Sequence, residues 1–163
     1  MNFKVVLAVS ISLLFFVFFK QKEGTDAEKV EYYKVFQQDD LKLIDKELQT
    51  LSTSMLPEKE AFIGAMLMKK AGLVSSPRDK LSLFKKGHAK LESAIMNQDK
   101  NAEYRFLRLV IQENAPAILG YKNDIGKDKE LILSLYKTLS VTVRDAIHGY
   151  TTRSKILHSE DFN

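Results

Sequence analysis

Three polar side chains stand out within a strongly apolar stretch near the middle of the chain. Arg105, Arg108 and Gln112 fall in a wedge about 60° wide on a helical wheel, and every other residue of 105–112 is apolar. A helix this apolar is largely buried, so the polar groups of its wedge need partners. Two arginines one turn apart form a fork that suits a carboxylate or a phosphate.

Two interpretations of this arginine pair are open from the sequence. In the first, the arginines pair with internal acids and hold helices in register. The candidate acids are Glu60, Asp79 and Glu103. In the second, Arg105, Arg108, Gln112 and Tyr121 bind a small anionic ligand in a pocket that the loop at Gly120 closes.

The sequence offers little for other chemistry. The three histidines, His88, His148 and His158, lack the spacing of a metal site, and the chain contains no cysteine. There is no glycine-rich phosphate loop and no nucleophile elbow. We therefore expect no metal, no cofactor and no catalytic residue, and the chain is predicted not to be an enzyme.

Charge is unevenly distributed along the chain. Residues 24–60 are mainly acidic, whereas residues 69–90 are strongly basic. The basic residues are Lys69, Lys70, Arg78, Lys80, Lys85, Lys86 and Lys90. They form either an ordinary solvated helix face or a surface for a protein partner or an anionic membrane. Nucleic acid is not expected, because this stretch lacks interleaved exposed aromatic residues.

The N-terminal segment predicts a route to the membrane. Val5 to Phe19 is an apolar run interrupted only by two serines and flanked by lysines. Small residues suited to cleavage do not follow the run directly, so residues 1–23 are predicted to be an uncleaved signal anchor, with a cleaved signal peptide and secretion as the alternative. The domain is expected outside the cytoplasm, in the periplasm if the source is bacterial.

Residues 24–157 are predicted to form one all-α domain, with a flexible tail over 158–163. Apolar periodicity and cap residues predict helices over 26–38, 40–52, 57–71, 76–96, 102–114, 126–139 and 141–157. Residues 61–68 carry no polar side chain, so that helix is expected at the centre. Short loops favour antiparallel helical hairpins in a bundle or short solenoid, plus an N-terminal apolar helix.

Two resemblances extend this interpretation. Gly87, Leu91 and Ala94 have the spacing of the second helix of a tetratricopeptide repeat, over about one repeat. The motif R-F-L-R-x-x-I-Q-x-N-A-P-x-x-L-G-Y at 105–121 resembles a family of small exported helical proteins of unassigned function, and the likeness covers about 60–140. The resemblance implies an extracytoplasmic helical domain with repeat-like packing, and it supplies no activity.

Together these features predict a membrane-anchored, extracytoplasmic module that binds or scaffolds an unidentified protein partner. The opposed charges of residues 24–60 and 69–90 suit such a partner or an anionic lipid surface. A small anionic-ligand-binding protein is the alternative, and an enzyme is the weakest candidate.

Overall fold

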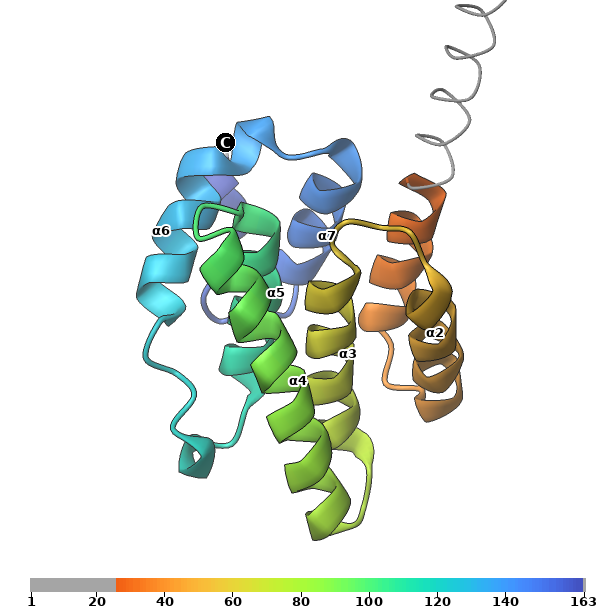
Figure 1. The fold of residues 1–163 in the computed structure, drawn as a ribbon. Helices are drawn as coiled ribbons and strands as arrows, with labels where there is room; N and C mark the ends of the chain where they lie inside the picture. The colour runs from red at the N-terminus through yellow and green to blue at the C-terminus, as the bar shows by residue number, and fades with distance from the viewer. Residues whose placement is uncertain (1–25, 163) are drawn as a thin grey trace, which may run out of the picture.

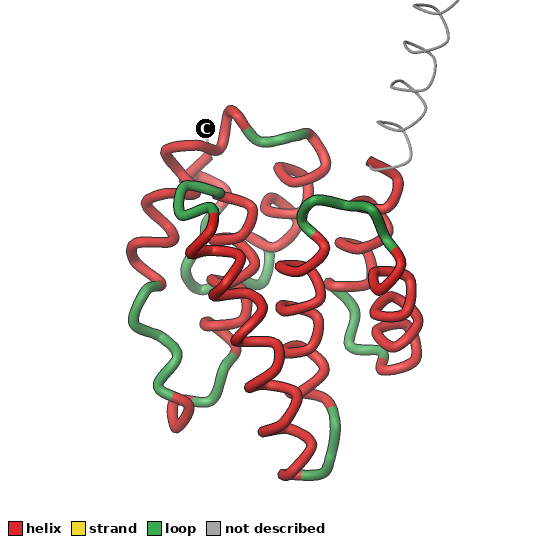
Figure 2. The backbone as a smooth tube through the Cα atoms, in the orientation of Figure 1, coloured by secondary structure: helices red, strands yellow, loops and turns green. Residues whose placement is uncertain are grey.

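The computed structural model of the chain describes residues 26–162, and these are helical with no strand among them (Figures 1 and 2). A first helix covers residues 26–36. It is followed by α2 (Leu41–Thr53), α3 (Lys59–Leu73), α4 (Pro77–Asn97), α5 (Ala102–Asn114), the 3₁₀ helix η1 (Ala117–Leu119), α6 (Ile125–Leu135), η2 (Tyr136–Thr138), α7 (Val141–Thr151) and η3 (Ser159–Phe162). The all-α prediction is confirmed for this part of the chain.

Four of the predicted helix starts rest on the expected side-chain caps. Asp40 accepts hydrogen bonds from the amides of Lys42 and Leu43 at the start of α2. The corresponding caps of α4, α5 and α7 are Ser76, Asn101 and Ser140. Each cap satisfies amides that would otherwise lack a partner, which explains why these starts could be predicted.

The apolar helix α3 lies at the centre, in contact with α2, α4 and α5. It runs antiparallel to α4 (Figure 1), and the two cross at Gly64 and Gly87. A Cβ added to Gly87 would lie 2.5 Å from the Gly64 carbonyl oxygen, and one added to Gly64 would lie 2.7 Å from the Leu91 amide nitrogen. Only residues without a side chain allow this approach, which confirms the expected close packing at Gly64.

Two boundaries of α3 differ from the prediction. Pro57 does not begin the helix, which starts at Lys59 after a turn. Gly72 does not end it, because α3 continues to Leu73 and its last amides still find helical acceptors. Gly72 therefore lies on an exposed helical turn without close neighbours.

In the C-terminal region the helices are shorter than predicted, and the last residues pack against the domain. The helix expected over 126–139 divides into α6 and η2, and the one expected over 141–157 ends at Thr151. Glu113 of α5 accepts hydrogen bonds from Ser154 and from the Lys155 amide, which competes with helix continuation. The expected tail is instead held in place, since Phe162 packs on Tyr136 and Asp161 lies 2.8 Å from Lys129.

The predicted signal anchor, residues 1–23, lies outside the described residues. From residue 26 onward, no helix combines the length and apolar character needed to cross a bilayer. Residue 26 stands at one end of the domain, and the turn between α3 and α4 stands at the other (Figure 1).

Candidate binding groove

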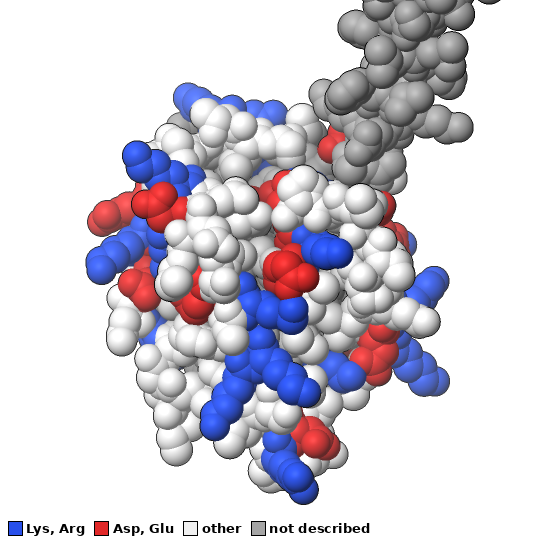
Figure 3. Space-filling model, in the orientation of Figure 1, with Lys and Arg blue, Asp and Glu red and all other residues white. Residues whose placement is uncertain are grey.

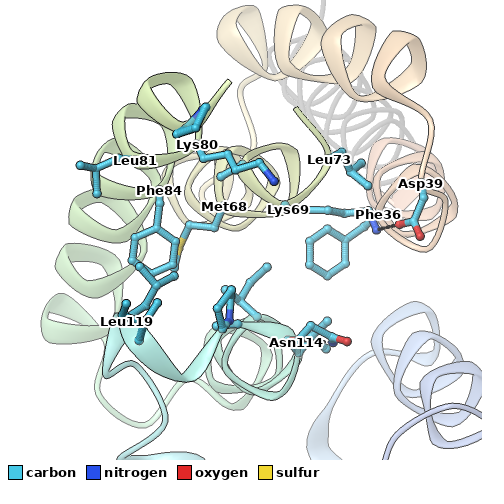
Figure 4. A pocket seen from close by; sticks show the side chains of 18 of the residues that line it. Phe36, Asp39, Met68, Lys69, Leu73, Lys80, Leu81, Phe84, Asn114 and Leu119 are labelled. Atoms are coloured by element: carbon cyan, nitrogen blue, oxygen red, sulfur yellow. Dashed lines mark hydrogen bonds and ion pairs between the residues drawn. The ribbon is translucent and has the colours of Figure 1, made fainter. Parts of the chain in front are cut away.

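A half-open groove of about 560 Å³ lies at the end of the molecule that carries the α3–α4 turn. It is formed by the end of the first helix, the second half of α3, the first half of α4, the end of α5, η1 and the end of α7. Its apolar floor and walls include Phe36, Met68, Leu73, Phe84, Val110 and Ile111 (Figure 4). A volume of this size is within the range of about 300–1,000 Å³ that is typical of ligand sites.

Local sequence signals place the walls of the groove. Ser76 caps α4 and Pro77 occupies its first turn, so residues spaced three and four apart line the groove: Lys80, Leu81 and Phe84. Opposite them, α5 ends at Asn114 because Pro116 cannot continue the helix. The amide of Asn114 donates to the Val110 carbonyl at 2.8 Å and to the Tyr150 hydroxyl at 2.9 Å.

Exposed apolar side chains extend the groove onto the surface. Leu81 is 49% exposed, Leu119 is 37% exposed and Ile118, at the tip of η1, is 94% exposed. Leu81 and Leu119 stand on opposite sides of Phe84 (Figure 4). The apolar lining of the cavity therefore continues over its edge onto the surface.

The rim of the groove is basic. Lys69 is paired with Asp39 at 2.7 Å, and this salt bridge lowers the pKa of the Asp39 carboxyl. Arg153 donates to the Gln37 carbonyl at 3.0 Å and lies over the Tyr150 ring. Lys80 lines the groove and, within residues 26–162, forms no ion pair.

The seven basic residues predicted as a surface divide into two groups. Lys69, Lys70 and Lys90 are paired with Asp39, Asp45 and Glu60 respectively. Arg78, Lys80, Lys85 and Lys86 are exposed on α4, and none of them has an acidic partner in the described part of the chain. Lysine and arginine side chains accordingly gather over α4 in Figure 3.

The arginine pair lies in a buried ion-pair network. Arg108 forms a two-pronged contact with Asp128 of α6, with Nε and Nη2 each 2.7 Å from a carboxylate oxygen. Its Nη1 lies 2.9 Å from Glu92 of α4, and Arg105 lies 3.2 Å from the same Asp128. Burial lowers the pKa of Arg108, but the hydrogen bonds and charge of Asp128 outweigh it, so the pKa is raised.

The structure therefore brings Arg105 and Arg108 together, but against internal acids. The acids are Asp128, Glu92 and Asp124, and the predicted partners Glu60, Asp79 and Glu103 were wrong. Asp124 occupies the N-cap position of α6, four residues before Asp128, and both carboxylates contact Arg108. The sequence predicted that the arginines pair with acidic residues, but it did not show which acidic residues pack against α5.

The other two residues of the predicted anion pocket also face inward. Gln112 is buried, and its Oε1 has no partner among the described residues. The Tyr121 hydroxyl donates to Glu92, and its ring meets Phe84 edge-on at 5.6 Å. Burial, followed by the Glu92 contact, raises the pKa of Tyr121. These contacts attach the loop after η1 to α4, beside the network that holds Arg108.

A second buried network joins the first helix to α3 and α5. Lys29 lies 2.9 Å from Glu58 and 3.0 Å from Glu103, and Tyr33 donates to Glu103 at 2.9 Å. Among the described residues, no group of three or more potential ligating side chains is arranged to hold a metal ion.

The groove was not recognised from the sequence. Its walls come from segments more than a hundred residues apart, and Phe36, Met68 and Ile111 look like ordinary core residues along the chain. The only local sign of the groove in the sequence was that the apolar Leu81 directly follows the basic Lys80. No protein-family model, curated protein or solved structure matches the chain.

Proposed function

We propose that the chain is a helical protein-interaction module that binds a segment of a partner protein in the groove. One observation carries this proposal: the apolar lining continues beyond the cavity as exposed Leu81, Ile118 and Leu119. A small molecule enclosed in the groove would leave these side chains in water. A polypeptide segment lying across the opening would cover them and would fill the cavity with its own apolar side chains.

The antiparallel pairing of α3 and α4 supports tetratricopeptide-like packing as part of this proposal. In such repeats, small residues let neighbouring helices pack closely, and Gly64 and Gly87 do so here. Helical repeats of this type commonly serve as binding surfaces for other proteins. The packing is therefore consistent with an interaction module, although the likeness extends over about one repeat.

The location proposed for this module is outside the cytoplasm, attached to a membrane by residues 1–23. The support is the apolar run at Val5 to Phe19 and the resemblance of residues 60–140 to small exported proteins. The α3–α4 turn, whose flanking residues line the groove, stands at the end of the domain opposite the start of the first helix (Figure 1). A chain attached through its N-terminal segment would present the groove away from its attachment point.

The proposal is tested by crosslinking the tagged chain in its own cells and purifying it from the membrane fraction. The variant Leu81→Asp places a charge on the groove edge, and Met55→Asp places one on an exposed apolar residue in the loop between α2 and α3. We expect a stoichiometric partner with the unmodified chain and with Met55→Asp, and its loss with Leu81→Asp. Equal recovery with all three chains would place the contact elsewhere and contradict the proposal.

A further inference from the structure

Resting on the proposed function, we infer that the segment bound in the groove is an acidic amphipathic helix. Three features of the groove indicate the chemistry of this partner: the apolar floor, the positions of the basic side chains around it, and the backbone of the walls.

The backbone of the walls selects a helical partner. Most of the residues that line the groove are helical, and the amides and carbonyls of those in helix interiors are already paired within the helices. No strand edge is available within residues 26–162 to bond an extended peptide. An extended segment in an apolar groove would leave its own backbone groups without partners, whereas a helix satisfies them internally.

The charge of the rim selects an acidic partner. Among the charged residues that line the groove, three are bases and one is an acid, Asp39, which is already paired with Lys69. On α4, the apolar residues Leu81 and Phe84 face the groove, and basic residues lie on both sides of them around the helix. At about 100° per residue, Lys80 lies about 40° to one side of Phe84, and Lys85 lies about 40° beyond Leu81 on the other side.

These flanking bases have no acidic partner within the described part of the chain. Arg78, Lys80 and Lys85 are exposed, and none of them pairs with an acid in the region from residue 26 to residue 162. Elsewhere on the same surface the structure does pair its lysines, as at Lys70 with Asp45 and Lys90 with Glu60. A partner helix with an apolar face bordered by carboxylates would bury the floor and neutralise the flanks.

Lys86 supplies an internal control for this inference. It is exposed on α4 like Lys85 and directly follows it, but it lies about 160° from Phe84 around the helix, on the side away from the groove. A charge change at Lys86 therefore alters the net charge of α4 without altering the rim. A partner held by the rim distinguishes the two lysines, whereas a flat anionic surface attracted by the whole helix does not.

The test is a selection from a displayed library of helices on the full chain in phosphatidylcholine nanodiscs. Library members keep leucine at positions i, i+3, i+4 and i+7, and the flanking positions vary among Glu, Gln and Lys. We expect Glu to be enriched over Lys roughly three- to fivefold per flanking position, the size of an exposed ion pair. The preference should fall at high salt and with Lys80→Glu or Lys85→Glu, but not with Lys86→Glu.

Three results would overturn the inference, and they differ in what they imply for the proposed function. Helices enriched without a preference for Glu, and lost with Leu81→Asp, would leave the groove as a binding site and remove only the acidic partner. If no helix is enriched while the Leu81-dependent partner persists in cells, the partner is not helical. Co-flotation with phosphatidylglycerol vesicles that falls equally with Lys85→Glu and Lys86→Glu, without helix enrichment, would identify an anionic membrane as the occupant.

Discussion

At the scale of single residues, the buried contact of Arg108 with Asp128 is the most consequential polar interaction of the domain. Both side chains are almost fully buried, and Asp128 is completely inaccessible to solvent. Removal of one partner leaves the other charge without compensation in the core. The pair is therefore expected to hold α5, α6 and α4 in register.

Arg108→Ala is expected to lower the free energy of unfolding by about 3–5 kcal/mol, because it leaves Asp128 buried with only its longer contact to Arg105. Arg105→Ala should cost about 1 kcal/mol or less, since Arg105 is more exposed and also donates to the Asp99 carbonyl. Urea denaturation of the two variants beside the unmodified chain measures both. Equal losses, or an Arg108→Ala loss below that of Arg105→Ala, would contradict the assignment.

The double variant Arg108→Met with Asp128→Leu separates charge from packing. Replacing a whole buried ion pair by apolar residues of similar volume is often neutral or stabilising, even where single removal is costly. We therefore expect the double variant to recover most of the stability lost in Arg108→Ala. A double variant as unstable as Arg108→Ala would show that Glu92 and Asp124 depend on the guanidinium as strongly as Asp128 does.

At the scale of elements, the crossing of α3 and α4 determines the shape of the groove. The glycines at the crossing bring the two backbones together, and beyond it the helices continue toward their connecting turn with Met68 and Phe84 between them. Any residue that separates the helices at Gly87 should therefore reduce stability and also widen the groove.

Gly87→Ala is expected to lower the free energy of unfolding by about 1–3 kcal/mol, because the new methyl group overlaps the backbone of α3. This loss should occur although alanine favours a helix by about 1 kcal/mol over glycine. Gly72→Ala, on the same helix pair but without any neighbour within 4 Å, should instead be neutral or stabilise by up to about 1 kcal/mol. Thermal unfolding of both variants checks the prediction, and similar melting temperatures for the two would contradict it.

The elements also show what the sequence could and could not predict. Helix starts with a capping side chain, such as those at Asp40, Ser76 and Asn101, were predicted within a residue, because the cap acts locally. The end of α7 was not, since it depends on Glu113, some forty residues earlier in the chain. The tail was expected to fray because nothing in its sequence indicates that Phe162 meets Tyr136.

In the candidate site, too, local features could be predicted from the sequence and long-range contacts could not. The arginines were identified from their spacing on one helix, whereas their partners lie on α4 and α6 and had to be found in the structure. The groove was missed because its walls come from separate segments whose apolar residues serve the core along most of their length. The basic residues of α4 were recognised as a surface, but which of them remain unpaired follows only from the fold.

At the scale of the whole molecule, the groove and the point where the chain enters the domain lie at opposite ends (Figure 1). The ion pairs and buried networks lie between them and involve elements from both halves of the chain. Ion pairs therefore connect helices across the domain, and Lys80, which has no acidic partner among residues 26–162, lines the groove.

The salt dependence of partner binding reports the summed charge of the groove rim. Binding of an acidic partner should weaken several-fold between about 0.1 M and 0.5 M NaCl, since exposed charges are screened over that range. Lys80→Glu should weaken binding at low salt and reduce its salt dependence, which titration at the two salt concentrations measures. Identical salt dependence of Lys80→Glu and the unmodified chain would show that the rim charge does not act in binding.

The central claim is that the groove contacts another polypeptide, and site-specific photocrosslinking tests it most directly. A photoreactive side chain is placed either at Ile118 on the groove edge or at Met55, which is comparably exposed at the other end of the domain. We predict a discrete crosslinked partner from Ile118 that disappears with Leu81→Asp, and none from Met55. A crosslink from both sites, or one from Ile118 that survives Leu81→Asp, would contradict the groove as the binding site.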